Sequence, residues 1–131
     1  MASRILVIDD DQSLLDLYRL LLEEEGHEVR LSLIAFEEVS DIEHMQPDLI
    51  ILDAKLGSEY QGLHLLQKLK MYRPTQAIPV LLCSAGMDVI SQQEQLLREK
   101  GIPILYKPFE IEELLQTVQQ VLHASFTTQE A

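Results

Sequence analysis

The sequence predicts an α/β protein with one doubly wound parallel sheet and helices on both of its faces. Short apolar runs rich in β-branched residues alternate with stretches that have the 3.6-residue period of amphipathic helices. The 131 residues are enough for one domain of this kind. Residues 48–52, with Leu49, Ile50 and Ile51 in succession, have the continuous apolar character of a strand that is buried on both faces.

Five strands are expected. Residues 4–8 are apolar and β-branched and predict a central strand, whereas residues 28–32 alternate only weakly and predict an edge strand. The other three strands are expected at residues 48–52, 78–83 and 103–106. Because a helical segment separates each strand from the next, right-handed crossovers should make all of them parallel.

Five helices are expected to follow these strands. The first covers residues 14–25 and ends at Gly26, a residue type common after helix C-termini. Pro47 and Pro74 end the second and third helices. The fourth, at residues 88–100, has few apolar residues and is expected to pack weakly against the core. Apolar stripes predict the other helices. The second helix has Phe36, Val39 and Ile42, and the third has Leu63, Leu65, Leu66 and Leu69. The stripe of the fifth helix covers residues 111–122.

Residues 4–123 are therefore expected to form the folded domain, with residues 124–131 as a short, polar, disordered tail. The formal net charge of −12, with ten scattered basic residues, argues against direct binding of nucleic acid. No apolar run approaches the ~20 residues that cross a bilayer, and no signal-peptide pattern is visible, so a cytoplasmic protein without membrane insertion is expected. The single cysteine, Cys83, excludes an intrachain disulfide and is expected to be an inert core thiol.

Polar side chains follow four of the expected strands. Asp9 and Asp10 follow the first, Asp53 the third, Ser84 the fourth and Lys107 the fifth. Because the carboxyl ends of parallel strands share one edge of the sheet, these groups should lie close together. Three neighbouring carboxylates repel unless a cation lies among them, and hard oxygen ligands without His or Cys favour Mg²⁺.

This set of groups suits a phosphoryl group. Mg²⁺ usually binds one or two carboxylates together with a phosphate oxygen, and a lysine and a hydroxyl suit the remaining oxygens. An aspartate can itself be the nucleophile and form an acyl phosphate. In this interpretation Asp53 attacks, Mg²⁺ screens the two anions, and Lys107 neutralises the developing charge.

Four sequence stretches together resemble a response-regulator receiver domain of two-component signalling, the chemotaxis-regulator-like family. The resemblance covers residues 4–123 and implies the flavodoxin-like strand order 2-1-3-4-5. It also implies a cytoplasmic signalling switch that is not an enzyme beyond self-phosphorylation and slow autodephosphorylation. The stretches are Ile5-Leu6-Val7-Ile8-Asp9-Asp10, Pro47-Asp48-Leu49-Ile50-Ile51-Leu52-Asp53, Pro79-Val80-Leu81-Leu82-Cys83-Ser84-Ala85 and Lys107-Pro108-Phe109.

The same resemblance implies the roles of the individual residues. Asp53 would accept a phosphoryl group from a histidine kinase or a phosphotransfer protein, with Ser84 and Lys107 bound to the phosphoryl oxygens. Mg²⁺ would be bound by Asp53, by Asp10 directly, by Asp9 mainly through water, and by the backbone carbonyl of Lys55. Signalling is expected through the fourth helix, the fifth strand and the fifth helix, to a downstream partner or output domain that the sequence does not identify.

The sequence departs from the family pattern in two places. Gly57 stands where a proline usually follows the acceptor, and the loop to Gly62 is one residue longer than the commonest form. Ile104 stands three residues before Lys107, where the family often has an aromatic side chain that rotates on activation. Tyr106 is expected to face away from Lys107, so it is no simple substitute for that aromatic residue.

Several alternatives remain open at this stage. The pair Asp9 and Asp10 could only cap the first helix, which is the expected role of Asp11. The Lys55 amine either reaches the phosphoryl group or is simply solvated. The domain could be a degenerate receiver that binds partners constitutively. A phosphatase with an aspartate nucleophile is a weaker alternative, because Lys55 replaces the second aspartate that such enzymes use as acid and base.

Two further groups of residues have open interpretations. The first helix has more apolar residues than one buried face needs, so it either presents a docking surface for a kinase or a second copy of the chain, or is buried unusually deeply. The four histidines show no metal-ligand spacing and are expected to be surface or packing residues. They are His27, His44, His64 and His123.

Overall fold

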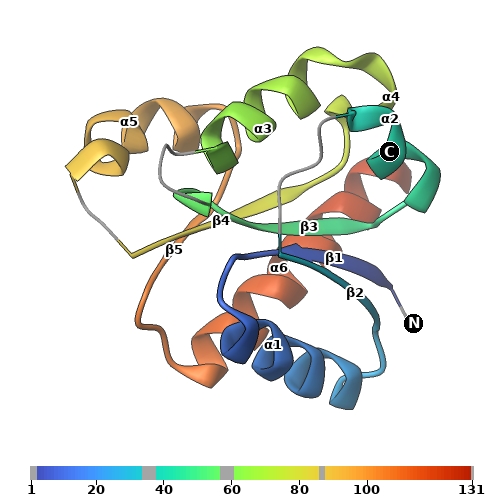
Figure 1. Cartoon of the computed structure of the whole chain (residues 1–131). Coiled ribbons are helices and arrows are strands. Elements are labelled where there is room, and N and C mark those ends of the chain that lie inside the picture. Colours follow the sequence, from blue (N-terminus) through green and yellow to red (C-terminus); the bar gives the residue numbers. More distant parts are fainter. Residues whose placement is uncertain (1–2, 34–37, 57–60, 86–87, 131) are drawn as a thin grey trace.

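The computed structural model describes residues 3–33, 38–56, 61–85 and 88–130, without the side chains of residues 88–92 and 125–130. Five parallel strands form one sheet in the order β2-β1-β3-β4-β5 (Figure 1). The fold class, the strand order and the edge position of the second strand are thus confirmed. The strands are β1 (Arg4–Ile8), β2 (Glu28–Ser32), β3 (Leu49–Asp53), β4 (Val80–Ser84) and β5 (Ile104–Tyr106).

Helices cover both faces of the sheet. In Figure 1, α1 and α6 lie on one side, and α2, α3, α4 and α5 lie on the other. The helices are α1 (Gln12–Glu24), α2 (Val39–Met45), α3 (Gln61–Met71), α4 (Arg73–Gln76), α5 (Asp88–Glu99) and α6 (Ile111–Glu130).

The core consists of two apolar layers, one on each side of the sheet. Alternation along β1 sends Ile5 and Val7 toward α1 and α6, and Leu6 and Ile8 toward α2 and α3. The central strand β3 is buried over its whole length, as the run at residues 48–52 predicts. This continuous burial on both faces places the end of β3, and with it Asp53, at the centre of the carboxyl edge.

The short helix α4 was not expected. The sequence predicted only that Pro74 ends α3. In the structure Pro74 lies in the first turn of α4, where the missing N–H of proline costs no hydrogen bond. The buried Thr75 hydroxyl donates to the carbonyl of Leu69 (2.8 Å) and so connects α4 to the end of α3. The described residues therefore contain six helices in place of the expected five.

The last helix extends beyond residue 123, at which the folded domain was expected to end. Helix α6 continues to Glu130, through residues 124–130, where a disordered tail was expected. The physical reason is that no Gly or Pro follows Pro108, so the sequence contains no residue that would end the helix near residue 123.

Smaller differences lie at other element ends. Helix α1 begins at Gln12, two residues before the expected start, because the Asp11 side chain caps it by accepting the N–H of Leu14 (3.3 Å). The capping role of Asp11 is confirmed. Phe36, which was predicted in the second helix, and Gly57, which was predicted in the loop after Asp53, lie outside the described residues.

Deep burial does not explain all the leucines of α1. Leu15, Tyr18 and Leu22 are buried, but Leu17 is 38% and Leu20 57% exposed. The deep-burial interpretation is therefore wrong for these two residues, which form an exposed apolar surface on α1.

Candidate functional site

The predicted site residues meet at the carboxyl edge of the sheet. Strand pairing aligns Ile8 with Leu52, Asp53 with Cys83, and Ser84 with Tyr106, so the ends of β1, β3, β4 and β5 lie side by side. Asp9, Asp53 and Ser84 are buried there, whereas Asp10 is exposed. The residue following β5, Lys107, reaches the same edge, where its backbone N–H donates to the carbonyl of Ser84 (2.8 Å).

Three carboxylates form the negative part of this edge. Carboxylate oxygens of Asp9, Asp10 and Asp53 all lie within 4.8 Å of one another. Groups of the same charge at this distance repel in a buried environment, and a divalent cation would relieve the repulsion. Because the donors are hard carboxylate oxygens with no His or Cys among them, the set fits Mg²⁺ better than a transition metal.

The lysine contributes a fixed positive charge. Lys107 Nζ lies 2.7 Å from Asp9 Oδ2 and 3.7 Å from Asp53 Oδ1, so it pairs with Asp9 and lies near Asp53. Burial lowers the pKa of Lys107, but the hydrogen bond that its ammonium donates to Asp9 and the charges of Asp53 and Asp9 outweigh this effect, and the net pKa is raised. The ammonium group therefore stays charged beside the carboxylates.

The environment of Asp53 disfavours its ionised form. Burial raises the pKa of the Asp53 carboxyl, and the charges of Asp9 and Asp10 raise it further, against the opposing effect of Lys107. The backbone N–H of Lys55 donates to Asp53 Oδ1 (3.3 Å), while the Lys55 side chain is exposed. Residue 55 thus lies directly beside the carboxylate, as its sequence position suggested.

Sequence reasoning missed the importance of Gly62. This residue lies in the first turn of α3 against the end of β3, where a Cβ atom would overlap the backbone carbonyl oxygen of Asp53 and lie 2.8 Å from that of Ala54. The N–H of Leu63 donates to the same Ala54 carbonyl (3.3 Å). A glycine in an otherwise leucine-rich helix start was the available signal.

Sequence reasoning also missed a buried aromatic pair beneath the site. The Tyr18 hydroxyl donates to Cys83 Sγ (3.5 Å), and its ring lies 6.0 Å from that of Phe109. Cys83 is buried, so its expected place in the core is confirmed, and burial raises the pKa of its thiol to about 12. Tyr18 therefore lies between Cys83 in β4 and Phe109, which precedes α6.

Ile104, which stands where the family often has an aromatic residue, lies on the same face of β5 as Tyr106. Ile104 is buried and Tyr106 partly buried in the apolar layer that faces α3 and α5, while Leu105 between them faces the opposite layer. At the position where the family often has an aromatic residue, this chain thus has Ile104, an ordinary core residue.

We predict that Asp53→Asn raises the stability of the metal-free protein. Because the folded-state pKa of Asp53 is raised, its ionised form is less favourable in the folded than in the unfolded chain. At pH 7 the variant should unfold at a higher urea concentration in the presence of a chelator. The difference in stability from wild type should shrink as pH falls through the raised pKa and the wild-type carboxyl takes up a proton.

Asp16→Asn, at an exposed position of α1, is the control and should show no such difference. Equal stability of Asp53→Asn and wild type at pH 7 would contradict the prediction.

The fold and the site together define a class of protein: a doubly wound α/β domain with an acidic pocket at the carboxyl edge of its sheet. The family model for the response regulator receiver domain matches residues 5–119. The chain belongs to this family, whose members are signalling proteins of two-component systems and generally bind Mg²⁺ at an acidic pocket of this kind.

Relatives and solved structures agree with this assignment. The chain is 34% identical to the DNA-binding dual master transcriptional regulator RpaA of Synechocystis over 91% of its own length and 48% of the relative. It is 31% identical to the nitrogen assimilation regulatory protein NtrX of Azorhizobium caulinodans over 93% of its length and 26% of the relative. A CheY-like receiver domain from Methanospirillum hungatei superimposes with a TM-score of 0.83 at 26% identity, covering 98% of this chain and 99% of that one.

The chain spans about half of RpaA and about a quarter of NtrX. The DNA binding that the name of RpaA states is a property of that longer protein. Among the described residues, no helix is both long enough and apolar enough to cross a bilayer.

Proposed function

We propose that this chain is a phosphorylation-controlled switch in which Asp53 accepts a phosphoryl group in a reaction that requires Mg²⁺. The observation that supports this most strongly is the position of the Asp53 carboxylate. It lies at the end of the central buried strand, with the carboxylates of Asp9 and Asp10 within 4.8 Å and the Lys107 ammonium, which also pairs with Asp9, 3.7 Å away.

The chemistry follows from these groups. An oxygen of the Asp53 carboxylate forms a bond to phosphorus while the bond from phosphorus to the imidazole nitrogen of a donor phosphohistidine breaks, and the released ring takes its proton from solvent. Mg²⁺ held by Asp9, Asp10, Asp53 and the Lys55 carbonyl would supply the charge that lets two anions approach. Lys107 neutralises charge on the phosphoryl oxygens, and the Ser84 hydroxyl donates a hydrogen bond to one of them.

The phosphorylated form would be recognised through the face made by α5, β5 and α6. Among residues 93–99 of α5, Leu97 is buried and Leu96 is 51% exposed, so this part of the helix has little apolar anchorage. New bonds from the phosphoryl group to Ser84 and Lys107 would bias its position. Hydrogen exchange in α5 that is the same with and without phosphorylation would contradict this proposal.

The test of the acceptor is intact-mass analysis after incubation with acetyl phosphate and Mg²⁺. Wild type should gain one labile phosphoryl group, and Asp53→Asn should gain none. Asp48→Asn, at the other end of β3, is the matched control and should be phosphorylated like wild type. A wild type that gains no phosphate and binds no Mg²⁺ would overturn the proposal in favour of a degenerate receiver that binds its partners constitutively.

We predict that Lys55→Ala shortens the lifetime of the phosphorylated form. The Lys55 backbone lies against the Asp53 carboxylate, so its exposed amine is within reach of a phosphoryl group there and would obstruct an attacking water. An exposed ion pair of this kind is worth up to about 1 kcal/mol, which corresponds to about fivefold faster loss of phosphate. The measurement is the decay of the phosphorylated mass after removal of the donor, with Lys68→Ala on α3 as the control. An unchanged decay rate would show that the amine is simply solvated.

A further inference from the structure

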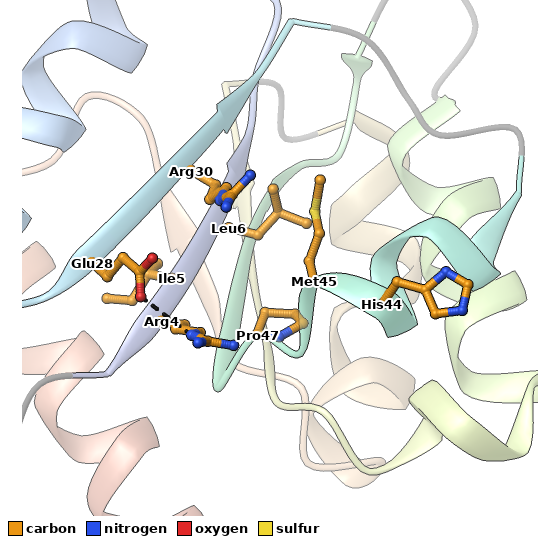
Figure 2. Close-up of a pocket in the computed structure, with 8 residues that line it drawn as sticks. All are labelled: Arg4, Ile5, Leu6, Glu28, Arg30, His44, Met45 and Pro47. Atoms are coloured by element: carbon orange, nitrogen blue, oxygen red, sulfur yellow. Dashed lines mark hydrogen bonds and ion pairs between the residues drawn. The ribbon is translucent and has the colours of Figure 1, made fainter.

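A hollow of about 240 Å³ lies at the amino end of the sheet, opposite the edge that carries Asp53 (Figure 2). Its apolar floor includes Leu6 of β1, Met45 at the end of α2, and Pro47 in the turn to β3. Charged side chains of Arg4, Glu28 and Arg30 line its sides. The hollow shares none of these residues with the phosphorylation site.

The hollow exists because α2 does not cover the edge strand. Alternation in β2 directs Val29 and Leu31 toward α1 and α6, which leaves Arg30 on the face toward α2, paired in register with Leu6. Helix α2 is only seven residues long and is followed by Gln46 in the left-handed conformation (φ 52°), after which the chain turns through buried Pro47. Among the described residues, Arg30 is therefore exposed on the face of β2 toward α2.

One of the two arginines is already neutralised. Arg4 Nε lies 3.2 Å from Glu28 Oε2, an ion pair between neighbouring strand ends. The nearby carboxylate of Asp48 is also occupied, because its Oδ2 accepts the backbone N–H of Arg4 (2.7 Å). The Arg30 guanidinium, in contrast, makes no hydrogen bond or ion pair with the described part of the chain.

The placement of the side chains favours an anion with an apolar body. Figure 2 shows Arg30, Leu6 and Met45 close together around one space, with the His44 ring directed away from them. A guanidinium binds a carboxylate through two parallel hydrogen bonds, and a methionine sulfur makes favourable contacts with aromatic rings. A volume of 240 Å³ is below the usual range of about 300–1,000 Å³ for drug-sized ligands, so it suits one ring with a short acidic arm.

We propose that this hollow binds a small aromatic carboxylate, with the carboxylate on Arg30 and the ring between Met45 and Leu6. The site is separate from the phosphoryl chemistry and does not depend on the proposed function. Its occupant is selected by the Arg30 guanidinium, which has no partner among the described residues and lies above an apolar floor, in a chain whose formal net charge is −12.

The experiment is a two-dimensional amide NMR titration of the whole chain with phenylacetate, phenylacetamide and acetate. Phenylacetate should cause saturable shifts at the amides of Leu6, Arg30 and Met45, with a dissociation constant on the order of 1 mM. Phenylacetamide lacks the charge and acetate lacks the ring, so both should bind at least about tenfold more weakly.

Two variants make the result specific. Arg30→Gln should weaken phenylacetate binding at least about tenfold, because it removes a charge-assisted pair from an exposed position that the fold does not require. Arg19→Gln, which removes an exposed arginine from α1, should leave binding unchanged. The proposal is overturned if phenylacetate causes no saturable shifts, if phenylacetamide binds equally well, or if the shifts centre on Asp9 and Lys107 instead.

Discussion

Gly62→Ala is expected to destabilise the domain by about 3 kcal/mol and to slow its phosphorylation. The added Cβ would overlap the carbonyl oxygen of Asp53, and the neighbouring Ala54 carbonyl would also be too close. Because both obstacles are backbone atoms at the end of the central strand, no side chain can rotate to make room. Either α3 or the end of β3 must move, and the latter carries the acceptor.

Gly26→Ala is the matched control for this variant. Gly26 has a left-handed backbone (φ 89°) but no atom within 4 Å of an added Cβ, so only conformational strain of about 1 kcal/mol is expected. Urea unfolding would measure both costs, and the rate of mass gain with acetyl phosphate would measure the effect on phosphorylation. If Gly62→Ala costs no more than Gly26→Ala and is phosphorylated at the wild-type rate, the close contact at Asp53 does not matter.

Lys107→Met is expected to lower the stability of the protein by about 3 kcal/mol when Mg²⁺ is absent. Methionine keeps much of the lysine stem but removes the ammonium group that lies 2.7 Å from buried Asp9. Three carboxylates would then remain close together without a fixed cation. Since Mg²⁺ would restore positive charge to the cluster, its addition should stabilise this variant more than it stabilises wild type.

The measurement is thermal or urea unfolding in chelator and in excess Mg²⁺. Lys68→Met, on the exposed side of α3, serves as the control and should change stability little in either condition. A Lys107→Met variant as stable as wild type in chelator would show that the ion pair with Asp9 contributes nothing to the fold. An equal response of both proteins to Mg²⁺ would show that the metal does not bind among these carboxylates.

Much of this molecule could be predicted from local sequence patterns. The apolar run at residues 48–52 predicted a central strand, because a strand with no polar alternation must be covered on both faces. It also predicted that Asp53 lies at the carboxyl end of this strand. The positions of Asp9, Ser84 and Lys107 after their strands then followed from the parallel topology. Two differences concerned the helices: the short helix α4 was not predicted, and α6 continues to Glu130. Helix termini depend on weak, local signals, so their positions are hard to predict.

The sequence by itself determined the alternation of strands and helices, the strand that delivers Asp53, and the charges that gather around it. Only the tertiary structure decided which partners those charges find. The pairing of Lys107 with Asp9 at 2.7 Å rather than with Asp53 at 3.7 Å, the contact of Gly62 with the Asp53 backbone, and the open face around Arg30 all depend on strand register and helix placement. These are set jointly by packing across the whole sheet, so no local stretch of sequence encodes them.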